Sequence, residues 1–276
     1  MKQIGKALFV ILALVLAGSL FANSSAQAAG ELDQIKANGK IRIAVFSDKP
    51  PFGFVDEDGK NQGYDVYLAH RLAQDLLGDP AKVEFVLVEA ASRIEILRAD
   101  KADVVLANFT VTAERAEQVD FAKPYMKVAL GVASPEGTPI TDVAQLAGKK
   151  LIVNKGTTAD SYVTKNHPEV ELIKYDQNTE AFNALRDGRG VGLAHDNTLL
   201  FAWVRENPGF VTGIDFLGDL DAIAPAVKKG NSELLSWLND EIAKLTGEGF
   251  FKADYEATLQ PIYGDSVDPN SVLISE

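Results

Sequence analysis

The 276-residue sequence contains no cysteine, and this absence removes several kinds of chemistry. A disulfide framework, a zinc ribbon, a thiol nucleophile and a lipid-modified N-terminal cysteine all need a cysteine sulfur. Basic residues are also in the minority, with 27 Lys and Arg against 39 Asp and Glu and a formal net charge of −12. Because nucleic-acid binding needs a basic surface that neutralises phosphates, the composition excludes nucleic acid as a partner.

The common catalytic motifs are absent as well. The sequence has no G-x-S-x-G, no G-x-x-x-x-G-K-[ST], no H-E-x-x-H and no G-x-G-x-x-G pattern, which are the usual signatures of nucleophile, phosphate and zinc sites. The three histidines, His70, His167 and His195, lack metal-ligand spacing. We therefore predict no catalytic residue, no metal site and no cofactor.

The only long apolar run lies near the N-terminus. Residues 7–21 are apolar and uncharged, follow a short basic start, and are too few to span a bilayer as a stable helix. Ala26 and Ala28 then place small residues at a cleavage site. This pattern predicts a signal peptide over residues 1–28 that is cleaved on export, with an uncleaved N-terminal anchor as the alternative.

Export without a lipid anchor follows, because no cysteine comes after the apolar run. Removal of residues 1–28 takes away two lysines and no acidic residue, so the formal net charge changes from −12 to −14. We expect a freely diffusing periplasmic protein.

The rest of the chain alternates short β-branched segments with amphipathic helical patterns. One helix begins near Asp65, the expected N-cap, and stops at Gly78. Such alternation predicts an α/β fold. The expected strands are 40–46, 83–88, 103–107, 127–133, 151–154, 170–175, 191–195 and 223–227, and the other expected helices are 93–99, 113–119, 158–166, 179–187, 198–206 and about 234–245.

Two regions interrupt this alternation. Residues 134–150 contain Pro135, Gly137 and Pro139 and then a short helix ended by Gly148, which predicts a domain boundary. The chain after residue 263 is polar, and we expect it to be frayed.

Polar groups follow several strands at the edge where open α/β sheets bind ligands. Asn108 and Thr110 follow one strand, and Arg115 enters the next helix, where its planar fork suits a carboxylate. Residues 155–158 join a strand to a helix whose free N–H groups favour an anion. Asp196 ends another strand and suits an ammonium. Together these groups predict a clamp for a zwitterion.

Four segments, in this order, resemble the amino-acid-binding proteins of ABC importers, the bacterial extracellular solute-binding family. They are FSDKPPFGFVDEDGKNQGYDVYLAHRLA, the T-x-T-x-E-R-A-x-x-x-D-F-A-x-P-Y pattern, NKGTTAD and AHDNTLLFAW. The resemblance covers essentially the whole mature chain. The segments KPPFGF, ANFT, NKGTTAD, KYDQNTE and HDNTLLFAW are most similar to members that bind cysteine.

The resemblance implies a type II periplasmic binding protein fold, with two lobes that are mixed sheets flanked by helices. A two-strand hinge near 133–134 and 223–225 joins them. Lobe 1 is expected over residues 29–133 plus 224–276, and lobe 2 over the inserted residues 134–223. The implied partners are a free amino acid and an ABC permease in the inner membrane, and we expect a monomer.

The resemblance also assigns the binding residues. Arg115 would bind the α-carboxylate together with backbone donors at Thr110 and Thr158, and Asp196 would bind the α-ammonium. Aromatic rings would wall the side chain, and one more arginine would face the pocket. The full expected ligand-binding set is Phe52, Arg93, Asn108, Phe109, Thr110, Arg115, Thr157, Thr158 and Asp196.

Each of these residues has an alternative role. Arg115 could form a solvated ion pair with Glu114, Glu117 or Asp120 on its own segment. Thr157, Thr158 and Asp196 could serve only as helix caps, and the two phenylalanines as ordinary core. Arg93 could contact the substrate side chain, support the carboxylate or pair with Glu89.

The identity of the substrate rests on weaker signals. An aromatic-walled pocket of modest polarity favours L-cysteine or a similar small amino acid, since sulfur contacts aromatic rings well. An acidic substrate would need Arg93 as a second cation, and a basic one would need Asp48 or Glu89 as a second acid. A cyclohexadienyl dehydratase-like enzyme, with one of those acids as proton donor, and a sensory ligand-binding module are the other functional classes.

Overall fold

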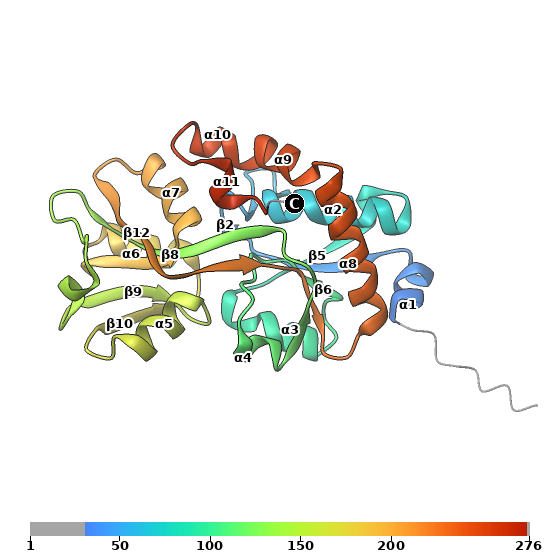
Figure 1. Ribbon diagram of the computed structural model, residues 1–276, viewed down its shortest axis with the longest axis horizontal. Helices are drawn as coiled ribbons and strands as arrows, with labels where there is room; N and C mark the ends of the chain where they lie inside the picture. The colour runs from blue at the N-terminus through green and yellow to red at the C-terminus, as the bar shows by residue number, and fades with distance from the viewer. Residues whose placement is uncertain (1–30, 275–276) are drawn as a thin grey trace, which may run out of the picture.

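The computed structural model describes residues 31–274 (Figure 1). The predicted signal peptide over residues 1–28 lies outside the described residues. Within the described part, no helix has both the length and the apolar character that crossing a membrane requires.

Two five-stranded sheets organise the chain and lie side by side in Figure 1, the first at the right and the second at the left. We call the halves that carry them lobe 1 and lobe 2. The first sheet has the order β5-β1-β6-β13-β7, and β13 runs antiparallel to both of its neighbours. Its strands are β1 (Ile41–Val45), β5 (Val83–Leu87), β6 (Val104–Val105), β7 (Val119–Phe121) and β13 (Ala226–Lys228).

Helices cover both faces of the first sheet, together with a small three-stranded sheet that follows β1. The helices are α1 (Glu31–Asn38), α2 (Tyr64–Leu77), α3 (Arg93–Arg98), α4 (Ala113–Ala116) and α8 (Ser232–Gly247). The small sheet consists of β2 (Asp48–Lys49), β3 (Gly53–Val55) and β4 (Asn61–Gln62). Short 3₁₀ turns occur at Pro80–Lys82, Ala90–Ser92 and Val143–Leu146, and the last of these is the short helix predicted before Gly148.

Helix α2 shows why the sequence pattern worked and where it failed. Its inward-facing residues are buried, and Gly78 ends it in the left-handed conformation (φ 77°), as predicted. Its N-cap, however, is Gly63, so the predicted capping role of Asp65 is wrong. The buried Asp65 carboxylate instead accepts hydrogen bonds from the Tyr125 hydroxyl (2.6 Å) and the Asn108 backbone N–H (2.7 Å).

The second sheet has the order β10-β9-β11-β8-β12, with β8 antiparallel to both β11 and β12. Its strands are β8 (Met126–Pro135), β9 (Lys150–Asn154), β10 (Glu171–Tyr175), β11 (Gly192–Asp196) and β12 (Phe210–Ile223). Its helices are α5 (Thr158–Asn166), α6 (Asn178–Arg186) and α7 (Asn197–Glu206). The predicted α/β fold with two lobes, each a sheet flanked by helices, is confirmed.

Strands β8 and β12 run between the lobes as a long antiparallel pair, from Phe210 opposite Pro135 to Ile223 opposite Met126 (Figure 1). The sequence did not predict β12, because its segment contains two glycines and three aspartates and only Leu217 and Ile223 are buried in it. Three register shifts break the alternation that marks an ordinary strand. Pro225 lies between β12 and β13, outside the ladder, where its missing N–H costs no strand hydrogen bond.

The predicted lobe boundaries at 133/134 and 223/224 stay a prediction. Ala133 pairs with Leu193 and Thr212, so it lies within the second sheet.

The C-terminal segment docks on the molecule. Helices α9 (Phe250–Asp254) and α10 (Gln260–Tyr263) flank a π-helical turn at Tyr255–Leu259, and α11 (Pro269–Val272) follows. Val272 is fully buried, and Leu273 forms a β-bridge with Met126 at the start of β8. The expectation of a frayed tail after residue 263 is therefore wrong for the described residues.

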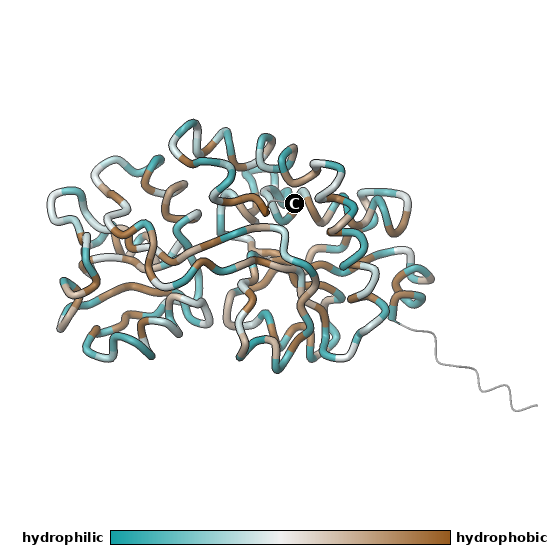
Figure 2. Tube along the Cα trace, viewed as in Figure 1, coloured by the Kyte–Doolittle hydropathy of each residue, from teal (hydrophilic) through white to brown (hydrophobic). Residues whose placement is uncertain are grey.

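Apolar residues lie mainly along the strands, and polar residues lie on the outer helices and loops (Figure 2). The largest apolar cluster draws on both sheets, with Ile43 from β1 and Ile152 from β9 among its members. The sheets are thus backed by apolar cores, and their polar strand ends face the region between the lobes.

Candidate functional site

The predicted ligand-binding residues lie at the facing ends of strands from the two sheets. Lobe 1 contributes the segments that follow β1 and β6, and lobe 2 contributes the end of β11 and the loop between β9 and α5. These are carboxyl ends of parallel strands, which is where open α/β sheets bind ligands.

A lysine that sequence reasoning missed lies at the centre of this region. The ammonium of Lys49 donates to the Asn108 side-chain carbonyl (2.6 Å) and to the Asp196 carboxylate (2.7 Å), and Lys49 is only 1% exposed. It also lies over the rings of Phe46 and Phe52, at 5.2 and 5.6 Å from their centroids. The only sequence signal was its place between a buried strand and a Pro-Pro pair.

The ion pair between Lys49 and Asp196 joins the two lobes. Burial opposes ionisation of Asp196, yet the Lys49 ammonium, by its charge and its hydrogen bond, holds the pKa of this carboxyl well below its ordinary value. Burial lowers the pKa of the Lys49 ammonium, and Asp196 acts against that shift. The Asp196 side chain does not cap α7, so the capping alternative is wrong.

His195 is neutral and structural. The backbone N–H of Asp196 donates to its Nδ1 (2.7 Å), so the ring proton lies on Nε2, which is 3.1 Å from the Asn178 side-chain oxygen. Burial, followed by the positive charge of Lys49, lowers the pKa of the ring. Within residues 31–274, no group of three acidic or histidine side chains lies where it could hold a metal ion.

Arg115 and Arg93 converge on the same lobe 2 carbonyl. Arg115 donates to the carbonyl oxygens of Thr110 (2.7 Å) and Gly156 (2.9 Å), and Arg93 donates to Gly156 (3.2 Å). Their guanidinium carbons lie 4.7 and 4.4 Å from the centroid of the Phe109 ring. Arg93 also donates to carbonyl groups at residues 90, 107 and 108.

Neither arginine forms an ion pair within the described part of the chain. The predicted alternatives, Arg115 with its neighbouring acids and Arg93 with Glu89, are therefore wrong. Burial lowers the pKa of Arg115 to about 10. Burial and the adjacent Arg115 charge lower the pKa of Arg93 well below its ordinary value. Both stay cationic near neutral pH, because a guanidinium is not deprotonated in proteins.

The loop before α5 supplies donors from lobe 2. Thr157 caps α5: its hydroxyl accepts from the Asp160 N–H (3.2 Å) and donates to the Asn154 carbonyl (2.7 Å). Thr158 is the first residue of the helix, where backbone N–H groups have no partner inside the helix. The capping role of Thr157 is confirmed, and it leaves the N–H of Thr158 free for an anion.

A cavity of about 410 Å³ opens beside these groups. It is lined by Phe109 and Arg115 from lobe 1 and by Gly156, Thr158 and Leu217 from lobe 2. Three of the nine predicted residues therefore line this cavity. The other six lie in the adjoining buried cluster around Lys49 and Arg93 or in the loops that support it; they are Phe52, Arg93, Asn108, Thr110, Thr157 and Asp196.

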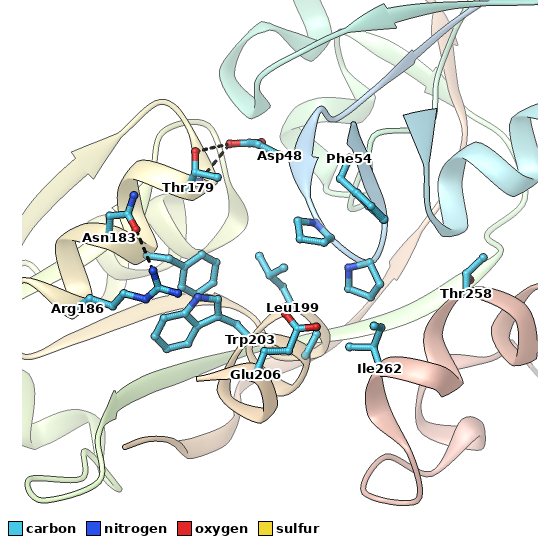
Figure 3. A pocket seen from close by; sticks show the side chains of 14 residues that line it. Asp48, Phe54, Thr179, Asn183, Arg186, Leu199, Trp203, Glu206, Thr258 and Ile262 are labelled. Carbon is cyan, nitrogen blue, oxygen red and sulfur yellow. Dashed lines mark hydrogen bonds between the residues drawn. The ribbon is translucent and has the colours of Figure 1, made fainter. Parts of the chain in front are cut away.

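A second cavity, of about 460 Å³, lies between the lobes next to Asp48 (Figure 3). The turn between β2 and β3 contributes Pro50 and Pro51 to its lining, and α6 and α7 contribute Phe182 and Trp203, whose ring centroids stack 4.7 Å apart. Asp48 itself accepts hydrogen bonds from the first residues of α6. None of the predicted ligand-binding residues lines this cavity.

The two lobes are in direct contact at the site. A Cβ atom added to Gly156 would lie 2.6 Å from the Cα of Ala91 on the opposite lobe. Three polar connections span the same boundary: Asp48 to α6, Lys49 to Asp196, and the two arginines to Gly156. The structure thus represents a closed arrangement of the two lobes.

This fold and site define a solute-binding protein that holds a small molecule between two lobes. Residues 41–259 match the bacterial extracellular solute-binding proteins, family 3, and the chain belongs to this family. It is an amino-acid-binding protein of an ABC transporter. The predicted family is confirmed.

Individual relatives show the extent of the similarity. The ABC transporter glutamine-binding protein GlnH of Bacillus subtilis is 32% identical over 259 residues, which is 92% of this chain and 94% of the relative. The solute receptor for L-cysteine of Neisseria gonorrhoeae is 62% identical, with a TM-score of 0.87 over 88% of this chain and 99% of that one. The cysteine-binding protein of Campylobacter jejuni is 57% identical, with a TM-score of 0.88 over 90% of this chain and all of that one.

Proposed function

We propose that this protein binds L-cysteine in the periplasm and delivers it to an ABC permease in the inner membrane. The observation that carries the proposal is the pair of solved cysteine-binding proteins, which are 62% and 57% identical over most of the chain. Relatives named for glutamine and arginine are about half as similar. A different polar amino acid, including an acidic one, is the alternative on the same scaffold.

In this proposal the α-carboxylate of the amino acid binds to Arg115 and to the N–H groups at Thr110 and Thr158. Arg115 already reaches across to Gly156 on lobe 2, so a carboxylate next to it would contact both lobes. The α-ammonium binds to Asp196, which it shares with Lys49. A carboxylate has about four acceptor sites, which is enough for two ammonium groups.

The cysteine side chain lies against the aromatic rings of Phe52 and Phe109, where sulfur makes favourable contacts. Asn108 and Thr157 support the site next to these rings. The Asn108 side-chain carbonyl accepts a hydrogen bond from the Lys49 ammonium, and the Thr157 hydroxyl caps α5. Arg93 supports the wall through the Phe109 ring.

Binding is coupled to closure of the lobes about the β8–β12 pair. Ligand contacts available from both lobes only in the closed form shift the population toward that form. Micromolar affinity corresponds to about −8 kcal/mol. The protein acts as a monomer, after removal of residues 1–28 and without a lipid anchor.

We propose a binding protein and not an enzyme. A dehydratase would need a proton donor over the substrate, and Asp48, one of the two candidates, is engaged by the start of α6. Incubation with arogenate or prephenate is expected to give no turnover.

A thermal-shift screen of the twenty amino acids, with cystine tested separately, checks the proposal. Run under reducing conditions, it is expected to give the largest stabilisation with L-cysteine, because a ligand that binds only the folded state raises its stability. Titration calorimetry then measures the affinity. A larger shift with glutamate or glutamine would assign the alternative substrate, and turnover of arogenate would refute the binding-protein assignment.

A further inference from the structure

Buried positive charge exceeds buried negative charge at the site. Lys49, Arg93 and Arg115 are 1%, 3% and 8% exposed, whereas the buried acids facing them are Asp65 and Asp196, at 0% and 4%. The two arginines have only carbonyl oxygens as partners. One positive charge therefore remains without a buried counter-charge.

The other ionisable groups near the site do not remove this excess. His195 is neutral, as its hydrogen bonds require. Glu114, Asp219 and Asp221 line the cavity beside Arg115, but the first two are exposed and the third is half-exposed, so water screens them. Charge left unbalanced in a buried site is costly, and a ligand that brings the missing charge gains affinity.

An amino acid with an uncharged side chain does not bring that charge, because its α-carboxylate and α-ammonium cancel. A ligand that balances the excess positive charge therefore needs an anionic side chain. The thiol of free cysteine has a pKa near 8.5 and loses its proton readily beside cations. The Lys49 ammonium has three N–H donors, of which two bind Asn108 and Asp196, so one remains for a ligand atom.

We propose that the site binds L-cysteine as the thiolate, with the excess buried positive charge at Lys49, Arg93 and Arg115 as the selecting feature. The thiol proton leaves to the solvent as the ligand enters, so one proton is released per cysteine bound. This inference rests on the proposed function. It makes Lys49 a specificity-determining residue that separates cysteine from serine, which has the same shape and no ionisable side chain in this pH range.

The absence of cysteine from the protein makes a direct test possible, since every thiol in the sample belongs to the ligand. Ultraviolet difference spectra of the mature protein with L-cysteine at pH 7, with a phosphine reductant, are expected to show thiolate absorbance that grows to one equivalent. Free cysteine at this pH is only a few per cent thiolate. Saturated protein without thiolate absorbance would overturn the inference, whereas failure of L-cysteine to bind would refute the proposed function instead.

Proton linkage provides a second readout. Affinity for L-cysteine is expected to rise roughly 80-fold between pH 6 and pH 8, following the thiolate fraction of the free ligand. The L-serine profile over the same range is the reference for pH effects that arise from the protein's own ionisable groups, such as Asp65 and His195. Equal pH profiles for the two ligands would contradict the thiolate.

A Lys49→Met variant tests the selecting charge. We expect its affinity for L-cysteine at pH 7 to fall by at least tenfold more than its affinity for L-serine, since a nearby cation lowers a thiol pKa by roughly one unit or more. Lys49→Arg keeps the charge and is expected to preserve the preference. An equal loss for both ligands in Lys49→Met would assign Lys49 a purely structural role and overturn its part in selection.

Discussion

The carboxylate of Asp48 accepts a hydrogen bond of 2.7 Å from the backbone N–H of Asn178, although 130 residues separate the two in sequence. The same carboxylate accepts from the Asn178 side-chain amide (2.9 Å) and the Thr179 N–H (3.2 Å). Asp48 belongs to lobe 1 and α6 to lobe 2. One lobe therefore caps a helix of the other, and only when the lobes are closed.

The first prediction concerns this interlobe cap. Asp48→Ala leaves both lobes intact but removes a helix cap and a favourable charge from the closed form alone, which is about 0.5–2 kcal/mol. Ligand affinity measured by calorimetry is expected to fall by roughly 2- to 30-fold, with little change in the thermal stability of the ligand-free protein. The matched control is Glu57→Ala, an exposed acid nearby, and equal affinities of the two variants would contradict the role of Asp48.

A second prediction concerns Arg115. Arg115→Ala removes the guanidinium expected to hold the α-carboxylate, and loss of one partner of a buried charge pair costs about 2–5 kcal/mol. Titration calorimetry is therefore expected to show an affinity loss of more than roughly tenfold. Arg98→Ala, which removes an exposed arginine of α3, is the control and is expected to bind normally. Unchanged affinity in Arg115→Ala would remove this residue from the binding site.

A third prediction concerns Asp196. Asp196→Asn removes the acceptor expected for the α-ammonium and leaves Lys49 buried without an anion, so both ligand affinity and stability are expected to fall. The affinity loss is expected to exceed roughly tenfold.

The pH dependence of this stability has a definite sign. The pKa of Asp196 is depressed in the folded state, so its contribution is present above the unfolded pKa near 3.9 and is lost as the pH falls through the acid range. Urea unfolding between pH 3 and pH 7 measures it. If the free energy of unfolding of Asp196→Asn changed with pH in the acid range as steeply as that of the parent protein, the result would contradict the ion pair.

A fourth prediction concerns Asp65. Burial raises its pKa to about 6, against which the Tyr125 and Asn108 hydrogen bonds act. Because the folded state holds this proton more tightly than the unfolded state, the contribution of Asp65 to stability decreases as the pH rises from about 4 to about 6. The decrease is about 2–3 kcal/mol for a shift of this size.

Asp65→Asn removes that titration. The variant is expected to lose the downward slope between pH 4 and pH 6 in urea unfolding, whereas the parent protein keeps it. Asp58→Asn, which alters an exposed acid, is the control and is expected to leave this slope unchanged. The same slope in Asp65→Asn and in the parent protein would show that Asp65 is not the group responsible.

Local sequence signals were sufficient where one segment determines its own structure. The 3.6-residue spacing in α2 and the glycine at position 78 set the body and the end of that helix. Helix α5 has the predicted bounds because its cap is local: the Thr157 hydroxyl accepts from the N–H of Asp160, three residues further along the chain. The predicted arginines and Asp196 were also brought together, because each follows or adjoins a strand end.

Pairings between distant segments could not be predicted in this way. Strand β12 lacks alternation and is ordered by its long pairing with β8. The tail has only a short apolar run at residues 272–274 within a polar segment, and it is ordered by docking beside Met126. The sequence around Lys49 is typical of an exposed loop. Its burial and its ion pair depend on Asp196, which comes from the other lobe.

The sequence by itself determined the chemical limits of this protein: without cysteine it has no thiol of its own, and its 39 acidic residues outnumber its 27 basic ones. It also indicated the class, because the segments that resemble the solute-binding family can be read from the sequence alone. Only the tertiary structure decided the charge of the site, because Lys49, Arg93, Arg115 and Asp196 come from both lobes. Burial removes the water that would otherwise screen these charges, so the net positive charge of the site acts directly on a bound ligand.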